Sequence, residues 1–205
     1  MLQKQVTQAG RTMVEALAYI SLMCILTASF AALVTSGYNK YRESRMSVEL
    51  TDLKKVITQR YVAAQDYSGV SWHDLCAEKI GPSSMLPKTK CEGTGENKEC
   101  KCADSDPVGK HAFSAPVYIS PEYEGALYSI YYEGVPQNMC VQLGSMPWGT
   151  LEGSDIERLE INDKSWSWEN SIYAKSGDKN MPADLDDIAK ACKEGFENKI
   201  KWYFS

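Results

Sequence analysis

The sequence predicts an α+β fold in which a long N-terminal helix, membrane-spanning in its first half, packs against a C-terminal head built on an antiparallel sheet. Three observations predict this fold: an uncharged apolar run over residues 16–34, a helical apolar pattern that continues to about residue 66, and alternating strand-like and helical segments from residue 67 onward. The 205 residues allow one ordinary domain plus such an appendage.

The apolar run extends from Ala16 to Val34 and contains neither charge nor proline. Its 19 residues would rise about 28 Å as a helix, close to the hydrocarbon thickness of a bilayer. We therefore predict a membrane span over about residues 16–34. A cleaved secretory signal is the alternative, but the run is longer than an ordinary signal core, Glu15 stands directly before it and no clear A-x-A site follows.

The helix is predicted to continue beyond the span. One helix over about residues 12–66 would be roughly 80 Å long. The alternative is two helices hinged at Gly37, because glycine costs a helix interior about 1 kcal/mol. The apolar residues that mark the amphipathic continuation are Tyr41, Val48, Leu53, Val56, Ile57 and Tyr61.

The head is predicted to begin with a short helix. Ser71, followed by Asp74, is a typical N-cap, and Gly81 and Pro82 would stop the helix after about Lys79. Residues 87–110 are rich in Gly, Lys, Glu and Asp, which predicts a loop tied down by cysteines.

The remaining elements follow from strand-like and helix-capping signals. Pro136 suits the first turn of a helix that carries Cys140, and Gly195 would close a helix over residues 184–195. Strands are predicted over residues 111–120, 125–134, 156–162, 171–175 and 198–205.

Charge is distributed unevenly and excludes one class of function. The formal net charge is −5, with +3 over residues 36–65 and −9 over residues 66–205. Binding to nucleic acid depends on clustered Lys and Arg that contact phosphates. An acidic head of this kind is therefore not expected to take nucleic acid as its main ligand.

Six of the seven cysteines fall in the polar part of the chain, which predicts disulfides if the head is exported. Six cysteines allow 15 connectivities. The alternative is a zinc site built from Cys91, Cys100, Cys102 and His111, whose spacing lacks the paired CxxC arrangement of common structural zinc sites. The six head cysteines are Cys76, Cys91, Cys100, Cys102, Cys140 and Cys192, and the seventh, Cys24, lies in the apolar run.

Few residues in the head point to catalysis or to a bound metal. No nucleophile, zinc-protease or phosphate-loop motif occurs, and His73 is interpreted as a surface residue. The acids Asp184, Asp186 and Asp187 lack the spacing of a calcium loop and suit a helix start. Trp166 and Trp168 would share one strand face, either in the core or as exposed aromatics that bind glycan. We expect no catalytic residue, cofactor or metal.

The segment GRTMVE, from Gly10 to Glu15, follows the polar leader MLQKQVTQA and opens the apolar run. It resembles the type III signal of type IV pilins and pseudopilins. In that family a prepilin peptidase cuts after the Gly, and the new N-terminus is usually methylated. The resemblance implies a leader over residues 1–10, a cut between Gly10 and Arg11, and a role for Glu15 in assembly. Arg11 departs from the family, which normally has an apolar residue there.

Three head segments narrow the resemblance to type IVb pilins, including those of conjugative thin pili. They are IGPSSMLP, YSIYYEGVPQNMCVQLG and ACKEGFENKIKWYF. In that family a late-middle cysteine pairs with one near the C-terminus, which implies a disulfide between Cys140 and Cys192. Because Cys100 and Cys102 are too close to bond without strain, we expect Cys76 and Cys91 each to take one of them.

The resemblance implies a non-enzymatic structural subunit with a stalk helix over residues 11–66 and a disulfide-bonded head over residues 67–205. It would be processed by the prepilin peptidase and polymerise with the inner-membrane assembly machinery into a pilus for adhesion, conjugation or motility. Its head would lie in the periplasm before assembly and outside the cell afterwards. The bases Lys40, Arg42 and Arg45 favour the opposite orientation by a simple charge count, which the head cysteines and the signal outweigh. The alternatives are a minor pilin, a secretion pseudopilin, and a membrane-anchored periplasmic binding module or enzyme.

Overall fold

The computed structural model describes residues 2–92, 99–103, 107–146, 156–169 and 171–205, with backbone alone over 2–12, 91–92 and 99–100. The chain divides into two compact units, Met1–Arg42 and Glu43–Ser205. Helix α1, Leu2–Tyr61, contributes to both units. Its first part is therefore described by itself, and its second part belongs with the head.

Helix α1 runs through Gly37 as a single α-helix, so the prediction of one continuous helix holds and the alternative of two helices hinged at Gly37 does not. Open space surrounds Gly37, so no neighbouring group competes with its helical backbone there. The helix ends at Tyr61 rather than near residue 66. A series of turns follows, in which Gln65 adopts a positive φ of 49° that an α-helix cannot accommodate.

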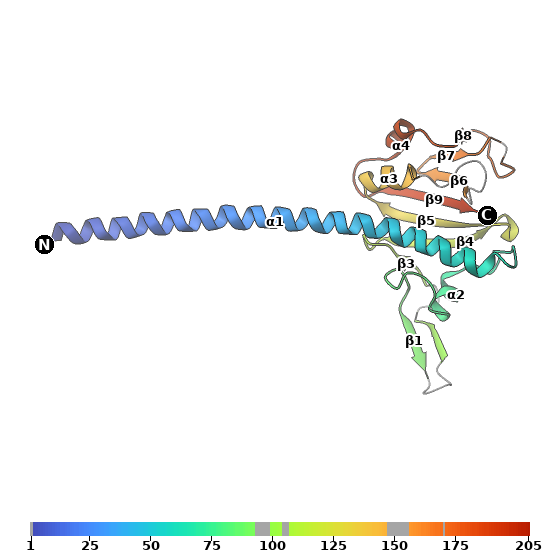
Figure 1. The fold of residues 1–205 in the computed structure, drawn as a ribbon, viewed down its shortest axis with the longest axis horizontal. Coiled ribbons are helices and arrows are strands. Elements are labelled where there is room, and N and C mark those ends of the chain that lie inside the picture. The colour runs from blue at the N-terminus through green and yellow to red at the C-terminus, as the bar shows by residue number, and fades with distance from the viewer. Residues whose placement is uncertain (1, 93–98, 104–106, 147–155, 170) are drawn as a thin grey trace. The chain divides into compact units, whose positions relative to one another are not determined.

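The head is built on a seven-stranded sheet with the order β3-β4-β5-β9-β6-β7-β8 (Figure 1). All neighbours are antiparallel except β7 and β8, which pair in parallel. The predicted α+β fold class is therefore confirmed, with one parallel pair at the edge. The strands are β3 Gly109–Lys110, β4 Pro116–Glu122, β5 Leu127–Val135, β6 Ile156–Ile161, β7 Lys164–Ser167, β8 Lys179–Asn180 and β9 Asn198–Phe204, with the 3-10 turn η2 Tyr123–Gly125 between β4 and β5.

The second part of α1 lies against one face of this sheet and supplies its core. The buried apolar residues recur at intervals of four, three and four, which places them on one side of the helix. They join one hydrophobic cluster with inward-facing residues of β5 and β9, whose side chains alternate between the two faces. The helix residues are Met46, Leu50, Leu53 and Ile57, and their partners include Ile130, Tyr132, Ile200 and Trp202.

In the sequence, a helix and a hairpin come between α1 and the strands of the sheet. Helix α2, Trp72–Ala77, starts at Ser71, whose hydroxyl accepts a hydrogen bond from the Asp74 amide as predicted. The prediction of a strandless loop over residues 87–110 was wrong. Strands β1, Thr89–Glu92, and β2, Glu99–Cys102, form a separate antiparallel pair. Backbone hydrogen bonds and a disulfide stabilise this hairpin, and neither can be inferred from the amino-acid composition of the segment.

Two further helices, α3 Gln137–Gly144 and α4 Leu185–Ala191, contact each other, and α3 also contacts β9 and β6 (Figure 1). The prediction of a helix to Gly195 was too long, because Cys192 leaves the helical conformation. The prediction of a strand over residues 171–175 was also wrong. Ser171 accepts hydrogen bonds from the backbone of Ala174 and, through its hydroxyl, of Tyr173, so a local turn replaces the strand.

Candidate functional site

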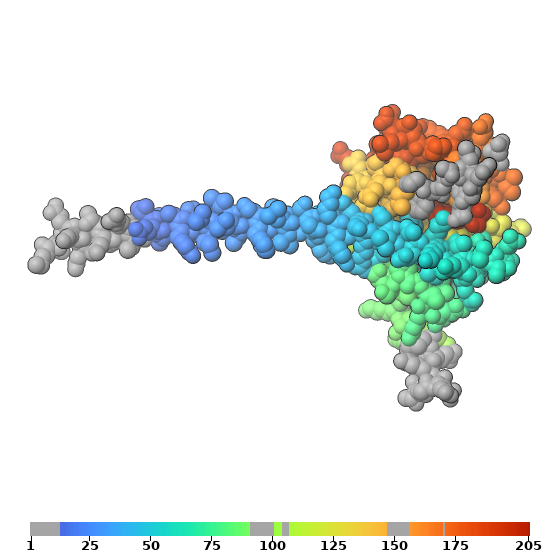
Figure 2. All heavy atoms as spheres, in the orientation of Figure 1, coloured from blue at the N-terminus to red at the C-terminus, as the bar shows by residue number. Residues whose placement is uncertain are grey.

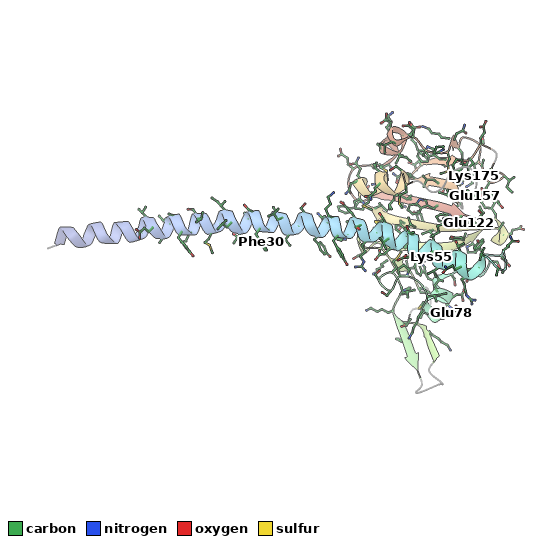
Figure 3. All side chains as sticks on the ribbon, viewed as in Figure 1. Phe30, Lys55, Glu78, Glu122, Glu157 and Lys175 are labelled. Carbon is green, nitrogen blue, oxygen red and sulfur yellow. A yellow bond between two sulfur atoms is a disulfide. The ribbon has the colours of Figure 1, made fainter. Side chains whose placement is uncertain are left out.

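The first part of α1 presents a continuous apolar surface. Large side chains from Met13 to Val34 are exposed, including Phe30 at 69% and Leu33 at 72% (Figures 2 and 3). Glu15 is the only charged residue in this stretch and is exposed too. An exposed apolar surface of this length requires lipid or protein around it.

The serine and threonine hydroxyls within the apolar run are satisfied by the helix itself. The hydroxyls of Ser21, Thr27 and Ser29 donate to the carbonyls of Ala18, Met23 and Ile25 at 2.8–2.9 Å. Hydroxyls paired in this way add little cost in hydrocarbon, where an unpaired polar group is expensive. Among the described helices, α1 is the one long and apolar enough to cross a membrane by length and composition. Glu15 is therefore the residue of this surface whose transfer into hydrocarbon would cost the most free energy.

Gly10 and Arg11, the predicted cleavage site, lie within α1, and the Arg11 side chain falls outside the described ones. A peptidase that binds an extended backbone would have to unwind the helix at this point. The assignment of residues 1–10 as a leader and of residues 11–66 and 67–205 as stalk and head stays a prediction.

A buried disulfide joins Cys140 in α3 to Cys192 at the end of α4, the pair that the resemblance implied. The two residues are 52 positions apart in the chain. A polar residue that sequence reasoning missed reinforces this junction. The buried Asn198 side chain donates to the carbonyls of Val135 and Lys193 and accepts from the Lys193 amide, which fixes the chain between α4 and β9. The sequence signal that could have indicated this role is an asparagine at the start of a strand that is otherwise rich in apolar residues.

A second disulfide joins Cys76 of α2 to Cys102 of β2 and fastens the β1–β2 hairpin to the head. Cys91 and Cys100 are opposite one another in the register of this hairpin, and their side chains lie outside the described ones. Cys76 and Cys91 were each expected to pair with one of Cys100 and Cys102. The first of these bridges is the one to Cys102, and the other, from Cys91, stays a prediction. Because Cys102 forms the disulfide with Cys76, it is not available as a ligand of the alternative zinc site.

His111, the other residue of the alternative zinc site, packs in the interior of the head. The His111 ring is 3% exposed, its Nε2 lies 2.7 Å from the Glu133 carbonyl, and it stacks on Tyr132 at 5.3 Å. Such a buried and bonded ring is a packing residue. His73, in contrast, is exposed. Among the described side chains no group of three or more His, Cys, Asp or Glu residues is placed to hold a metal.

The acids and tryptophans singled out in the sequence serve the fold. Asp184 caps α4 by accepting from the Asp186 amide, and Asp187 pairs with Lys179 at 2.7 Å. Trp166 is fully buried in the core. Trp168 lies just past β7, and its indole nitrogen donates to the Ile156 carbonyl. The two rings are thus not a pair of exposed aromatics on one strand.

A buried ion pair that sequence reasoning missed holds the segment after β7. Arg158 of β6 donates through Nε and Nη2 to the two carboxylate oxygens of Asp178, at 2.9 and 3.1 Å. Burial alone would raise the pKa of Asp178, but hydrogen bonds from the Lys175 amide, Ser165 and Arg158, together with the Arg158 charge, hold it below its usual value. The carboxylate therefore stays ionised and clamps this segment to the sheet.

Comparisons with known proteins gave structural matches alone. No protein-family profile matches the chain, and no curated protein sequence matches it. Its structure is similar to that of the type IVb pilin from Salmonella typhi, with a TM-score of 0.43 and 12% identity, over 76% of this chain and 97% of that one. A second match is TcpA, a type IV pilin from Vibrio cholerae El Tor biotype, with a TM-score of 0.45 and 11% identity, over 80% of this chain and 99% of that one.

Proposed function

We propose that this protein is a pilin subunit that polymerises through its N-terminal helix into a surface filament. The observation that carries the proposal is one helix with two environments. From Met13 to Val34 its large apolar side chains are exposed, and Glu15 is the one charged residue among them. Four apolar side chains between Met46 and Ile57 are instead buried in the core of the disulfide-bonded head. Such a helix can sit in a membrane first and exchange lipid for neighbouring helices afterwards.

The proposal assigns a use to the signal at the start of the chain. A prepilin peptidase would cut between Gly10 and Arg11, so that Glu15 becomes the fifth residue of the mature protein. The head would lie in the periplasm before assembly, where its disulfides form in an oxidising compartment. Assembly machinery of the inner membrane would then extract the subunit into a pilus that serves adhesion, conjugation or motility.

Glu15 is proposed to set the axial register between subunits. A carboxylate buried without a partner among apolar helices costs several kcal/mol, and a cation recovers much of that cost. The proposed partner is the free amine of a neighbouring subunit. Arg11, four residues away on the same helix face, is the competing partner, but a pairing within one chain supplies no contact between subunits.

Two experiments test the proposal. Surface filaments are purified and their subunit is analysed by intact mass and terminal sequencing, which should find a chain that begins at Arg11. Gly10→Ala should accumulate the uncut form in the membrane. A surface filament whose subunit still carries Lys4 contradicts the processing step, and an uncut, monomeric protein favours a membrane-anchored periplasmic module instead.

The second experiment separates the two partners of Glu15. Glu15→Ala should leave processing and head folding intact but abolish filaments, while Arg11→Phe should be tolerated. Impaired assembly in Arg11→Phe, to nearly the extent seen in Glu15→Ala, would assign the pairing to Arg11. Normal filaments from Glu15→Ala exclude both partners.

A further inference from the structure

The sheet has a polar face opposite the one that α1 covers. Along β5, β9 and β6 most residues that alternate with the core positions are polar, charged or aromatic. Tyr131, Lys201 and Glu160 follow one another across the three strands, because Tyr131 pairs with Lys201 and Lys201 with Glu160 in the strand register. Rigid strands thus place an aromatic ring, an ammonium and a carboxylate side by side.

A pocket of about 300 Å³ opens on this face. Pockets for small molecules begin at about this volume, which suits one sugar unit better than a large ligand. Each lining residue carries a polar or charged group, and together they come from three neighbouring strands and the turn after β6. The lining residues are Tyr131, Glu160, Asn162, Lys199 and Lys201.

The positions of these side chains are fixed by groups around the pocket. Glu160 accepts from the Tyr203 hydroxyl at 3.0 Å and pairs with Arg158 at 2.6 Å. Asn162 donates to the Ala191 carbonyl and accepts from the Lys199 amide, which holds the start of β9 beside the pocket. The site is therefore organised before any ligand arrives, which lowers the entropic cost of binding.

The two lysines bring positive charge to one side of the pocket. Lys199 and Lys201 are two residues apart on β9, so both side chains point to this face. The Lys201 ammonium lies 2.7 Å from Glu122, and that of Lys199 lies 3.4 Å from Glu133. Each ammonium has three donor hydrogens, so it can serve a ligand carboxylate as well as its protein carboxylate.

Tyr131 supplies an aromatic face beside these charges. Its ring stacks on Tyr118 of β4, with centroids 5.7 Å apart and planes 28° apart. The strand neighbour on its other side is Lys201, which lines the pocket. The apolar face of a sugar ring can pack against a tyrosine held in this way.

We propose that this pocket binds one acidic sugar unit, with its carboxylate between Lys199 and Lys201, its ring against Tyr131 and its hydroxyls donating to Glu160. The combination of ammonium donors and a carboxylate acceptor matches a ligand that carries one carboxylate and several hydroxyls. A phosphate dianion fits less well, because Glu160, Glu122 and Glu133 would repel its second charge.

The proposal rests on the proposed function for its biological setting. If filaments form around α1, the sheet face opposite α1 is the one left to face outward. The pocket would then be repeated along the filament, and repeated weak sites bind a polymeric glycan with high avidity. The acidic sugar would belong to a polysaccharide on another surface.

The test measures sugar binding to the full chain in detergent by saturation-transfer NMR, with glucuronic acid and glucose as the probes. Glucuronic acid should bind and glucose should bind at least about tenfold more weakly, because it lacks the charge-assisted contacts. The double variant Lys199→Gln/Lys201→Gln should lose binding by a similar factor. Tyr131→Leu should weaken both sugars.

Lys55→Gln is the control, because it makes the same substitution at an exposed lysine of α1 (Figure 3). It should bind glucuronic acid like the parent protein, and near-ultraviolet circular dichroism should confirm folded heads in every variant. The proposal is overturned if glucuronic acid does not bind, if glucose binds equally well, or if the double lysine variant binds like the control. Since the measurement needs no filament, failure here leaves assembly untouched, and failure of assembly leaves this result standing.

Discussion

Removal of the Cys140–Cys192 disulfide is expected to destabilise the head by about 4 kcal/mol. The bridge closes a loop between residues 52 positions apart, and the loop-closure relation for that length gives about 4 kcal/mol at 25 °C. The Cys76–Cys102 bridge spans 26 residues, for which the same relation gives about 3.5 kcal/mol. Because the dependence on length is logarithmic, the two bridges should differ by only about 0.6 kcal/mol.

The assay is guanidinium unfolding of the full chain in detergent, followed by tryptophan fluorescence. All five tryptophans lie at or after Trp72, so the signal reports on the head alone. The double variant Cys140→Ala/Cys192→Ala removes the bridge without leaving a thiol that could exchange. Cys24→Ala is the control, since Cys24 is unbonded and exposed in the apolar run. It should unfold like the parent protein.

A loss below about 1 kcal/mol would refute the reasoning. It would mean that the unfolded head keeps α3 and the end of α4 close together without the bridge, so that the bridge has little chain entropy to remove. A loss far above 4 kcal/mol would also refute it, since the native junction around Asn198 would then depend on the bridge for its geometry.

Three further outcomes are expected. Leu53→Ala should cost 2–5 kcal/mol of head stability in the same unfolding assay, because a fully buried side chain between helix and sheet is truncated. Gly109→Ala should cost about 1–3 kcal/mol, because its new Cβ would overlap the Trp72 ring, which is fixed by a hydrogen bond to β4. For Asp178, whose pKa is lowered in the folded head, the stabilisation from the Arg158 pair should be complete above about pH 4 and decline as the pH falls further. Unfolding midpoints measured from pH 6 to pH 2 should show this decline, and Asp178→Asn should flatten it.

The helix and most strands could be predicted because their signals are local. The apolar run and the helical spacing of the positions after it lie within the sequence itself, so the length and type of α1 do not depend on distant residues. The buried side was predicted only in part. Leu53 and Ile57 are buried as expected, but Tyr41 and Val48 are exposed, and Met46 and Leu50 take their place in the core. The end of the helix was less predictable. It depends on a turn around Gln65 that packing with the rest of the head determines.

The β1–β2 hairpin escaped prediction for a physical reason. Strand signals in a sequence come from side chains that bury against a sheet, and this pair stands apart from the seven-stranded sheet. The hairpin is held by backbone hydrogen bonds and by the bridge between Cys76 and Cys102. The sequence alone does not determine this bridge, because six cysteines allow 15 connectivities. The turn at residues 171–175 was missed because a serine hydroxyl competes with strand pairing there.

The polar pocket depends on strand order, which no local pattern contains. The alternation of Lys199 and Lys201 with apolar residues predicts that both lysines face away from the core. It does not predict that Glu160 and Tyr131 flank them. That follows from the insertion of β9 between β5 and β6, strands that come earlier in the chain.

The central position of β9 also links folding to the order in which the chain becomes available. Strands β3, β4 and β5 form one half of the sheet and β6, β7 and β8 the other, and β9 is the strand that joins them. Neither half can bury its inner face fully before Ile200, Trp202 and Phe204 are in place. Cys192 precedes β9 by only a few residues, so the bridge to Cys140 and the closure of the sheet become possible together. In an exported chain, both steps must therefore wait until β9 has crossed the membrane.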